Sequence, residues 1–497
     1  MKNSFQRLGY LLLFFSAFGY AQVNGLENEL SPKLMLQDLN ILKENLELIH
    51  PGLYVYTTEQ EMEVYFEELR ASLDQPMKPI VFYRKLVSIH NKIRDGHTFV
   101  IPPEEWSVAV ETHLPHFPFD VYHDGEKLFI LKNFSDTTEI DEGLEIISIN
   151  GLSSTEVFDS LIESWTKDGY NKTFPAMLIQ QDFSEFYANI FGTAKVYDLV
   201  VKKEEIEIPY RIDGLPISEI RTRSMQRYQF DKRPWYNDNK NPPLQLTLKD
   251  GVAILRVPTF SINTIEDTKI DYEDFFKAAF TKITNANCNN LIIDIRGNGG
   301  GEGDVATELF SYLHDKPFNL LKEIHTITNK ITNKKFFEGN VSSTNFQMKA
   351  GLKRIGENKF TPKPAAARKK HLSLEDKEPA TPYYGGKVYV LIDGWSFSAS
   401  GMFTALIKNY NRGIFIGEEA GSNPHTQNGD FEQMLKLPNS GVRMRIPLLH
   451  YKMNVNFENT GQGVIPDHYI KNSIAEELNK EDAVMEWTLD FIREKKK

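Results

Sequence analysis

Residues 291–301 read LIIDIRGNGGG, a hydrophobic run that passes directly into a glycine-rich turn. The run predicts a strand buried on both faces, and the turn can aim successive backbone N–H groups at one anion. Further along, residues 388–401 read VYVLIDGWSFSASG, a second buried strand that leads serines to the start of an apolar helix. A serine beside free N–H groups supplies the nucleophile and the oxyanion site that acyl transfer requires.

The C-terminal half of the chain has the pattern of an α/β core. From residue 244 to residue 497, segments typical of buried strands alternate with segments of helical periodicity, which is the rhythm of βαβ units. Residues 322–385 interrupt this rhythm with a stretch rich in Lys, Asn, Thr and Pro. We expect that stretch to be a surface insertion in the core.

The N-terminal half predicts two further units. Residues 30–105 carry apolar residues at helical spacing and predict a helical domain that ends in an Asp-Gly-His-Thr turn. In residues 106–215 the order is strands, an Ile-Asn-Gly turn, a helix capped by serine, and closing strands. This order resembles a PDZ module, an α+β domain that binds an extended peptide by strand addition. The polar and proline-rich residues 216–243 predict a linker.

Composition and charge narrow the function classes. The chain has 497 residues, of which 41% are hydrophobic and 25% charged, as in a globular protein of several domains. A net charge of -11 argues against nucleic acid as a partner. Cys288 is the single cysteine, so no intrachain disulfide is possible, and we expect it to be a buried structural residue. No pattern indicates an oligomeric state.

Residues 1–21 predict a secretory signal peptide. Two cationic residues precede a short apolar run that ends in small residues. The run is too short to span a membrane comfortably, and no later segment approaches that length of hydrophobic sequence. We therefore expect an exported protein, periplasmic or extracellular, with no integral membrane segment after cleavage.

Three serines compete for the role of nucleophile: Ser396, Ser398 and Ser400. Small neighbours let the backbone turn sharply, although the strict Gly-x-Ser-x-Gly elbow is absent. A serine before a helix is most often an N-cap. The glycine turn lacks the P-loop and Gly-x-Gly-x-x-Gly signatures, and it could equally be a tight turn without a ligand. The residue pattern alone leaves these alternatives open.

Together, DIRGNGGG, the Ser-Ala-Ser of residues 398–400 and the GEEAG of residues 417–421 resemble the S41 family of serine peptidases, the C-terminal-processing and tricorn-type proteases. The resemblance implies a multidomain α/β protein with a crotonase-like (ClpP-like) βαβ core. It also implies hydrolysis of peptide bonds in extended or C-terminal segments of a peptide or protein substrate. By the same resemblance Ser398 is the nucleophile, and Ala399 with Gly299 or Gly300 supplies the oxyanion hole.

The general base divides this family. Its processing proteases use a lysine in a Gly-Lys step just after the GEEAG-like segment, but here Gly421 is followed by Ser-Asn-Pro-His. The nearest lysines, Lys408 and Lys436, lie on the following helix and in a later strand-like run. A Ser–Lys dyad is therefore not expected.

The tricorn-type members recruit a histidine from the N-terminal part and a distant glutamate, which correspond here to His97 and Glu458. A neutral imidazole, with an ordinary pKa of about 6.5, can accept a serine proton near neutral pH. His425 is the alternative base and Glu419 the alternative acid. Thr98, next to His97, could form a hydrogen bond within the site.

No cofactor or metal is expected, because the histidines are scattered and no His-Glu-x-x-His or cysteine cluster occurs. Two rival functions fit the same fold. One is a catalytically silent protein that binds a peptide or a lipophilic ligand. The other is hydrolysis of acyl esters or thioesters. The fold alone does not choose among them.

Overall fold

The computed structural model describes residues 26–229, 243–369 and 374–495. The expected signal peptide, residues 1–21, lies outside these ranges, as do residues 230–242 of the expected linker. Within the described ranges, no helix combines the length and the hydrophobicity that a membrane span requires.

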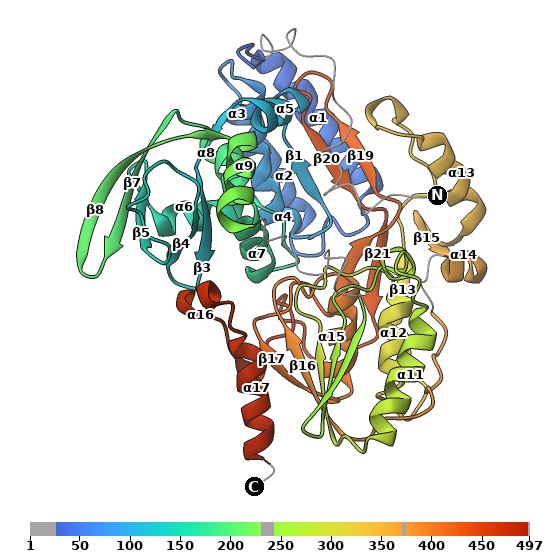
Figure 1. Ribbon diagram of the computed structural model, residues 1–497. Coiled ribbons are helices and arrows are strands. Elements are labelled where there is room, and N and C mark those ends of the chain that lie inside the picture. The colour runs from blue at the N-terminus through green and yellow to red at the C-terminus, as the bar shows by residue number, and fades with distance from the viewer. Residues whose placement is uncertain (1–25, 230–242, 370–373, 496–497) are drawn as a thin grey trace.

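The C-terminal half is built on a six-stranded sheet, seen edge-on below the centre of Figure 1. Its strands, in spatial order, are β10 (Gln245–Lys249), β11 (Val252–Arg256), β12 (Asn290–Asp294), β16 (Lys387–Ile392), β17 (Ile414–Gly417) and β22 (His468–Tyr469). Neighbours from β11 to β22 are parallel, and β10 is an antiparallel edge. Their crossovers contain α10 (Ile262–Glu266), α11 (Tyr272–Asn285), α12 (Gly303–Ser311) and α15 (Ala399–Asn409).

Strand β12 is buried along its whole length, as its sequence predicts. Leu291 and Ile293 pack into the hydrophobic cluster that also contains residues of α11, α12 and α15. Ile292 points to the other face, where α17 (Ala483–Glu494) covers the sheet. Because β12 and β16 are parallel neighbours, the glycine turn and the serine segment emerge side by side at one edge of the sheet.

The N-terminal helices form the upper layer in Figure 1. They are α1 (Pro32–Ile49), α2 (Glu59–Ala71), α3 (Pro79–Leu86), η2 (Val87–Ile89), α4 (His90–Ile93) and α5 (Glu104–Thr112). The hydrophobic core of these helices is not formed by N-terminal residues alone. Strand β1 (Phe99–Ile101) pairs with β20 (Arg443–Ile446), which pairs with β19 (Gln433–Lys436). Side chains of this C-terminal hairpin, such as Leu435 and Met444, complete the helical core.

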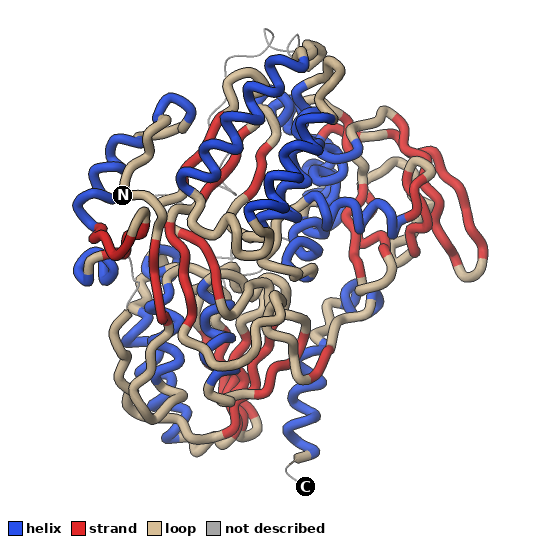
Figure 2. The backbone as a smooth tube through the Cα atoms, turned by 180° about the vertical axis from the view of Figure 1, so that it is seen from behind, coloured by secondary structure: helices blue, strands red, loops and turns tan. Residues whose placement is uncertain are grey.

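Residues 115–216 form an antiparallel sheet flanked by helices, at the side of the molecule in Figures 1 and 2. The strands are β3 (Phe119–His123), β4 (Leu128–Asn133), β5 (Glu145–Ile149), β6 (Leu152–Ser153), β7 (Val196–Lys203) and β8 (Ile206–Asp213), with β2 (Pro115–His116) and β9 (Leu215–Pro216) as a separate pair. The helices are α6 (Ser154–Ser164), α7 (Thr173–Gln181) and α8 (Phe183–Phe191). Ser153 caps α6 in a capping box with Glu156, as the sequence predicts.

Part of the expected linker 216–243 is a helix, α9 (Ile217–Tyr228). Helix α9 contains no proline, and Glu219 pairs with Arg223 one helical turn later. Ile220 is buried, and Arg223 donates to the carbonyl of Phe134 at 2.8 Å. These contacts dock α9 on the antiparallel sheet instead of leaving it as a connector.

The insertion 322–385 is more integrated than a surface excursion. It contains η4 (Lys334–Phe336), α13 (Val341–Gly351), β14 (Leu352–Gly356), β15 (Lys359–Pro362) and α14 (Pro364–Lys369). Strand β13 (Leu321–His325), at its start, pairs with β21 (Leu449–Met453), which pairs with β18 (Thr426–Gly429). Val341 and Met348 are buried in the core of the N-terminal helices. The remaining helix is α16 (Ile474–Asn479).

Candidate active site

Ser398 stands out from its two neighbouring serines by its backbone and its surroundings. It occupies the residue before α15 with φ 57° and ψ -119°, a conformation that non-glycine residues adopt mainly at functional sites. Its side chain makes no capping hydrogen bond and is half-buried. Ser396 Oγ instead donates to the Ile295 carbonyl at 3.2 Å, and Ser400 is fully buried inside the helix packing. Ser398 is thus the serine available for chemistry.

His97 faces Ser398 from the N-terminal part of the chain. Its Nε2 lies 3.1 Å from Ser398 Oγ. The residue follows α4, which ends at Arg94 in a left-handed conformation that turns the chain sharply. The imidazole is 4% exposed and stacks on Phe397 with ring centroids 4.7 Å apart. Packing on that ring holds the imidazole plane in place beside the hydroxyl.

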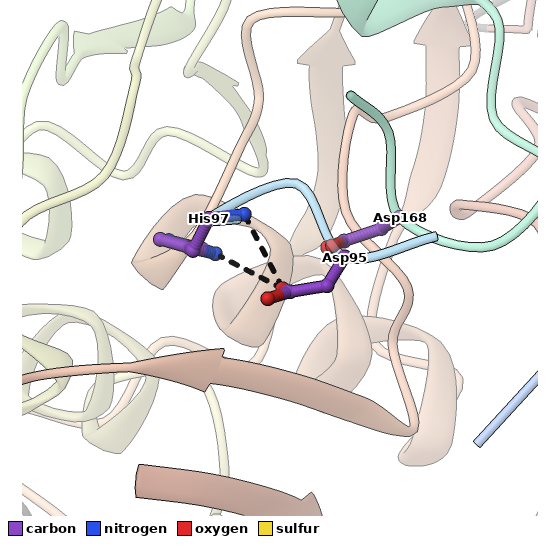
Figure 3. A group of neighbouring side chains, drawn as sticks. All are labelled: Asp95, His97 and Asp168. Carbon is purple, nitrogen blue, oxygen red and sulfur yellow. Dashed lines mark hydrogen bonds and ion pairs between the residues drawn. The ribbon is translucent and has the colours of Figure 1, made fainter. Parts of the chain in front are cut away.

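Asp95 lies on the far side of the His97 ring, two residues earlier in the same turn (Figure 3). Its Oδ1 is 4.0 Å from His97 Nδ1 and accepts the His97 backbone N–H at 3.3 Å. Nδ1 has no hydrogen-bond partner among the described residues. A distance of 4.0 Å is an electrostatic contact rather than a hydrogen bond, and a shift of about 1 Å would close it.

A buried hydrogen-bond network holds Asp95. His50 Nδ1 accepts the Gly52 N–H at 3.1 Å, so in the neutral ring the proton is on Nε2. That Nε2 lies 2.8 Å from Thr98 Oγ1 and 3.3 Å from Asp95 Oδ2. The Thr98 hydroxyl in turn donates to Asp95 Oδ2. Donors on two sides therefore fix the carboxylate behind His97.

These surroundings shift the two pKa values in a way that suits proton transfer. Burial lowers the pKa of His97 to about 4, against the opposing charge of Asp95, so the ring is neutral at pH 7. Burial of Asp95 would favour its neutral form, but the hydrogen bonds from His50 and Thr98 help to hold its pKa below the ordinary range. A neutral base therefore faces the hydroxyl, and a carboxylate lies behind it.

A second carboxylate, Asp168, reaches the same place from the loop between α6 and α7 (Figure 3). It is 2% exposed, and its Oδ1 accepts the Gly96 N–H at 2.7 Å. Its Oδ2 accepts the Asn423 N–H at 3.3 Å. Burial, and next the charge of Asp95, raise the pKa of Asp168 to about 7.

The glycine turn after β12 lies directly against Ser398. A Cβ placed on Gly300, which has φ +100°, would come within 2.7 Å of Ser398 Cβ. The Gly300 N–H donates to Asn298 Oδ1 at 2.9 Å, whereas among the described residues nothing accepts the N–H groups of Gly299 and Ala399. Of the two expected glycine donors, Gly299 is the one whose N–H is free to bind an oxyanion.

Asp393 ties the glycine turn to the serine segment. Its carboxylate accepts the Gly297 N–H at 3.1 and 3.0 Å and the Trp395 N–H at 2.9 Å. Burial raises the pKa of this carboxyl to about 7. The two loops that present the nucleophile and the free N–H groups are therefore cross-linked by one side chain.

The structure brings Ser398, His97, Ala399 and Gly299 together but not the expected glutamate. Glu458 is exposed, and its backbone carbonyl accepts from His425 Nε2 at 3.1 Å. His425 packs against Phe457, and no hydrogen bond among the described residues joins it to Ser398. Glu419 Oε1 accepts the Gly463 N–H at 2.7 Å. Asp95, not a glutamate, is the acid that lies beside His97.

Several side chains around the pair are not singled out by the sequence interpretation. Asp95 belongs to the Arg-Asp-Gly-His-Thr turn that the interpretation highlights only for His97 and Thr98, and His50 marks the break after the first helix. Because Asp95 lies only two residues before His97, the sequence could have indicated it as a candidate acid. Asp168 lies in an aromatic-rich stretch with no motif, so only the fold reveals it.

Asp95, His97 and Asp168 each offer one ligand atom, all within 4.8 Å of one another. Two ligands of one Zn²⁺, each about 2.1 Å from the ion, are at most about 4.2 Å apart. The 4.0 Å between Asp95 Oδ1 and His97 Nδ1 is near that limit, and both carboxylates already accept several hydrogen bonds. The geometry fits hydrogen bonding better than metal ligation.

Comparison with known proteins adds a family and a fold. Residues 251–470 match the model of Peptidase family S41. The tail-specific protease of Haemophilus influenzae is 23% identical over 169 residues, which is 34% of this chain and 17% of that protein. The chain thus matches only a small part of the length of this relative.

Two solved structures share the fold over most of the chain. The crystal structure of mature CPAF has a TM-score of 0.57 at 16% identity, covering 92% of this chain and 95% of CPAF. The structure of mature CPAF complexed with lactacystin has the same TM-score at 17% identity, covering 93% and 97% of the two chains. At this identity the likeness concerns the fold.

Proposed function

Since residues 251–470 match the model of Peptidase family S41, we propose that the protein is a serine-type peptidase with Ser398 as its nucleophile and His97 as its general base. The observation that carries the proposal is the 3.1 Å contact between His97 Nε2 and Ser398 Oγ. It joins two segments far apart in the chain, and the Ser398 side chain does not cap its helix. A packing role alone would require neither feature.

The reaction follows from the protonation states. The neutral His97 Nε2 takes the hydroxyl proton as Ser398 Oγ attacks the peptide carbonyl, and the imidazolium then protonates the leaving amine. Water, activated in the same way, releases the acyl group from Ser398. The proton on Nδ1 faces Asp95, whose carboxylate steadies the imidazolium in each step. Asp95 thus takes the orienting role that the family resemblance assigns to Glu458.

The oxyanion would bind between the two free N–H groups. The Ala399 N–H opens α15, where the helix dipole favours negative charge, and the Gly299 N–H comes from the facing turn. The Ser398 N–H donates to Ser422 Oγ at 2.7 Å and is not available. Two preorganised donors match the usual number in serine hydrolases.

The substrate is a peptide or protein, and we propose that it is cut within an extended or C-terminal segment. The antiparallel sheet of residues 115–216, with α6 against it, supports a PDZ-like unit that presents such a segment by strand addition. The parallel sheet of β11 to β22 with its crossovers supports a crotonase-like core, and the helices before residue 115 support an N-terminal domain. Export of the mature protein remains part of this proposal.

Fluorophosphonate labelling of the mature protein tests the assignment. Label on Ser398 in a peptide mass map, absent in Ser398→Ala and strongly reduced in His97→Gln, is the expected result. Ser396→Ala is the matched control, because that hydroxyl bonds to a backbone carbonyl. No label under conditions that modify a control hydrolase would instead favour a silent protein that binds a peptide or lipophilic ligand. Cleavage of esters with indifference to peptides would point to the acyl-ester alternative.

A further inference from the structure

The carboxylate of Asp168 forms hydrogen bonds to the backbone segments that lie next to His97 and next to Ser398. On one side it accepts the N–H of Gly96, the residue between Asp95 and His97. On the other side it accepts the N–H of Asn423 at 3.3 Å, and the preceding residue, Ser422, accepts the Ser398 N–H at 2.7 Å. These contacts therefore connect the turn of the base, through Asp168 and the backbone of residues 422–423, with the nucleophile.

The loop that carries Asp168 is also held by backbone contacts with the turn before His97 and with the C-terminal core. Thr166 Oγ1 donates to the Asp95 carbonyl at 2.6 Å, and the Gly169 N–H donates to the Arg94 carbonyl at 2.9 Å. Toward the core, the Tyr170 N–H donates to the Gly461 carbonyl at 2.7 Å. The loop would remain docked through these bonds without the Asp168 carboxylate.

A buried acid is costly unless a cation offsets it, and within the described part of the chain no lysine or arginine forms an ion pair with Asp168. Its nearest acidic neighbour, Asp95, increases the cost. A carboxylate that is retained under these conditions indicates a functional demand for an acceptor-only group.

We propose that Asp168 is a positioning residue that aligns Ser398 with His97, by accepting from Gly96 beside the base and from Asn423, the neighbour of the Ser422 that holds the nucleophile. The inference rests on the proposed function of Ser398 and His97. Only a carboxylate can accept from Gly96 on one oxygen and from Asn423 on the other, because an amide would present its NH₂ group to one of these donors.

Ionisation of Asp168 should then appear in the pH profile. The titratable and charged groups that face it are Asp95, His97, Tyr56, Arg94 and His450, the last three lining with it a cavity of about 10 Å³. Burial raises the pKa of Asp168 to about 7, and that of His97 is lowered to about 4. We expect labelling of Ser398 to rise as Asp168 loses its proton near pH 7, well above the titration of His97.

The test is a double-mutant cycle read by the fluorophosphonate inactivation rate. Asp168→Asn and Ser422→Ala should each lower the rate at saturating reagent by at least about 10-fold, and the double variant should be no slower than Asp168→Asn alone. The step near pH 7 should vanish in Asp168→Asn, while the reagent concentration at half-saturation stays unchanged. Lys167→Met, next in the loop and paired with Glu163, is the control that should keep the full rate.

Wild-type labelling in Asp168→Asn, or additive losses in the double variant, would overturn the inference while leaving the proposed function intact. An unlabelled wild type would instead overturn the proposed function. Amide hydrogen exchange then tests the positioning by itself. Protection of the peptides around Gly96 and Ser398 should fall in Asp168→Asn and Ser422→Ala but not in Lys167→Met, and unchanged protection would refute it.

Discussion

Ser398 and His97 are separated by 301 positions in the chain, yet one contact of 3.1 Å joins them. Each residue is placed by local physics: Ser398 by a strained backbone at the start of α15, and His97 by a turn that Arg94 closes in a left-handed conformation. Their pairing depends on a third element, the aromatic ring of Phe397, on which the imidazole stacks. Local structure therefore explains the conformation of Ser398 and of His97 separately, but it does not explain why the two residues lie next to each other.

Replacing Asp95 tests the identity of the acid. Asp95→Asn should lower kcat by about 10²–10⁴-fold, because the imidazolium loses the carboxylate behind Nδ1. Glu458→Gln is the matched control and should change kcat by less than about 2-fold, since its side chain is exposed. Steady-state hydrolysis of a peptide substrate measures both. The reverse order of effects would restore the glutamate to the role that the family resemblance assigns to it.

At the scale of elements, the glycine turn after β12 and the start of α15 form one unit cross-linked by Asp393. The turn requires glycine where another segment of the same chain approaches too closely to leave room for a side chain. Gly300, with φ +100°, is such a position, and Gly151 in the Ile-Asn-Gly turn, with φ +81°, is a position where only the backbone conformation favours glycine.

These two glycines make a matched pair of variants. Gly300→Ala should cut peptide hydrolysis by at least about 100-fold, because a displacement of roughly 1 Å at the nucleophile has that effect. Gly151→Ala has nothing within 4 Å of the added Cβ and should cost only about 1–2 kcal/mol of stability. Activity assays and urea unfolding of both proteins distinguish the effects. Full activity in Gly300→Ala would show that the turn does not shape the site.

His90 links helix α4 to α6 and β1 by two hydrogen bonds, and its burial leads us to expect that stability depends on pH. Its Nδ1 bonds to the Ser164 carbonyl at 2.9 Å, and its Nε2 accepts the Val100 N–H at 2.8 Å, so the ring must be neutral. Burial lowers its pKa to about 4, below the ordinary value of about 6.5 in the unfolded chain.

Between pH 6.5 and about pH 4, His90 therefore binds a proton in the unfolded chain but not in the folded protein. The free energy of unfolding decreases as the pH is lowered through this range. Relative to His90→Gln, which does not titrate, the wild type should lose about 2 kcal/mol of unfolding free energy between pH 7 and pH 5. Urea unfolding of both proteins at the two pH values measures the difference. Equal losses in the two proteins would contradict a neutral, buried His90.

At the scale of the whole molecule, the segments cooperate across the expected domain boundaries. The helices before residue 115 share their core with the β19–β20 hairpin and with part of the insertion 322–385. The loop of Asp168 bridges the same helical unit and the α/β core. The site is therefore assembled from three parts of the chain.

Leu435 on β19 tests this cooperation. Leu435→Ala removes a fully buried side chain and should cost about 2–5 kcal/mol. The increase in hydrogen exchange should appear in α1 and α2, although these helices are distant in sequence. Ile206→Ala, at a side chain that is 66% exposed, is the control and should cost less than about 0.5 kcal/mol. Exchange confined to the hairpin itself would show that the helices fold independently.

The sequence by itself predicted the buried strands, the two loops at their carboxyl ends, the resemblance to peptidase family S41, and Ser398 and His97 as the candidate nucleophile and base. These features depend on local patterns: continuous hydrophobic runs, glycines where a side chain would collide, and a short motif around each residue. The helical cap at Ser153 and the burial of Cys288 are equally local and were equally predictable.

Only the tertiary structure decided which acid lies behind His97, which N–H groups are free, and how the N-terminal helices complete their core. Asp168 acquires its place in the site through hydrogen bonds to residues 72 and 255 positions away, and no local pattern encodes such contacts. The helix α9 and the docked insertion differ from expectation for the same reason. Polar composition predicts exposure, but a few buried side chains such as Ile220 and Met348 suffice to anchor a segment.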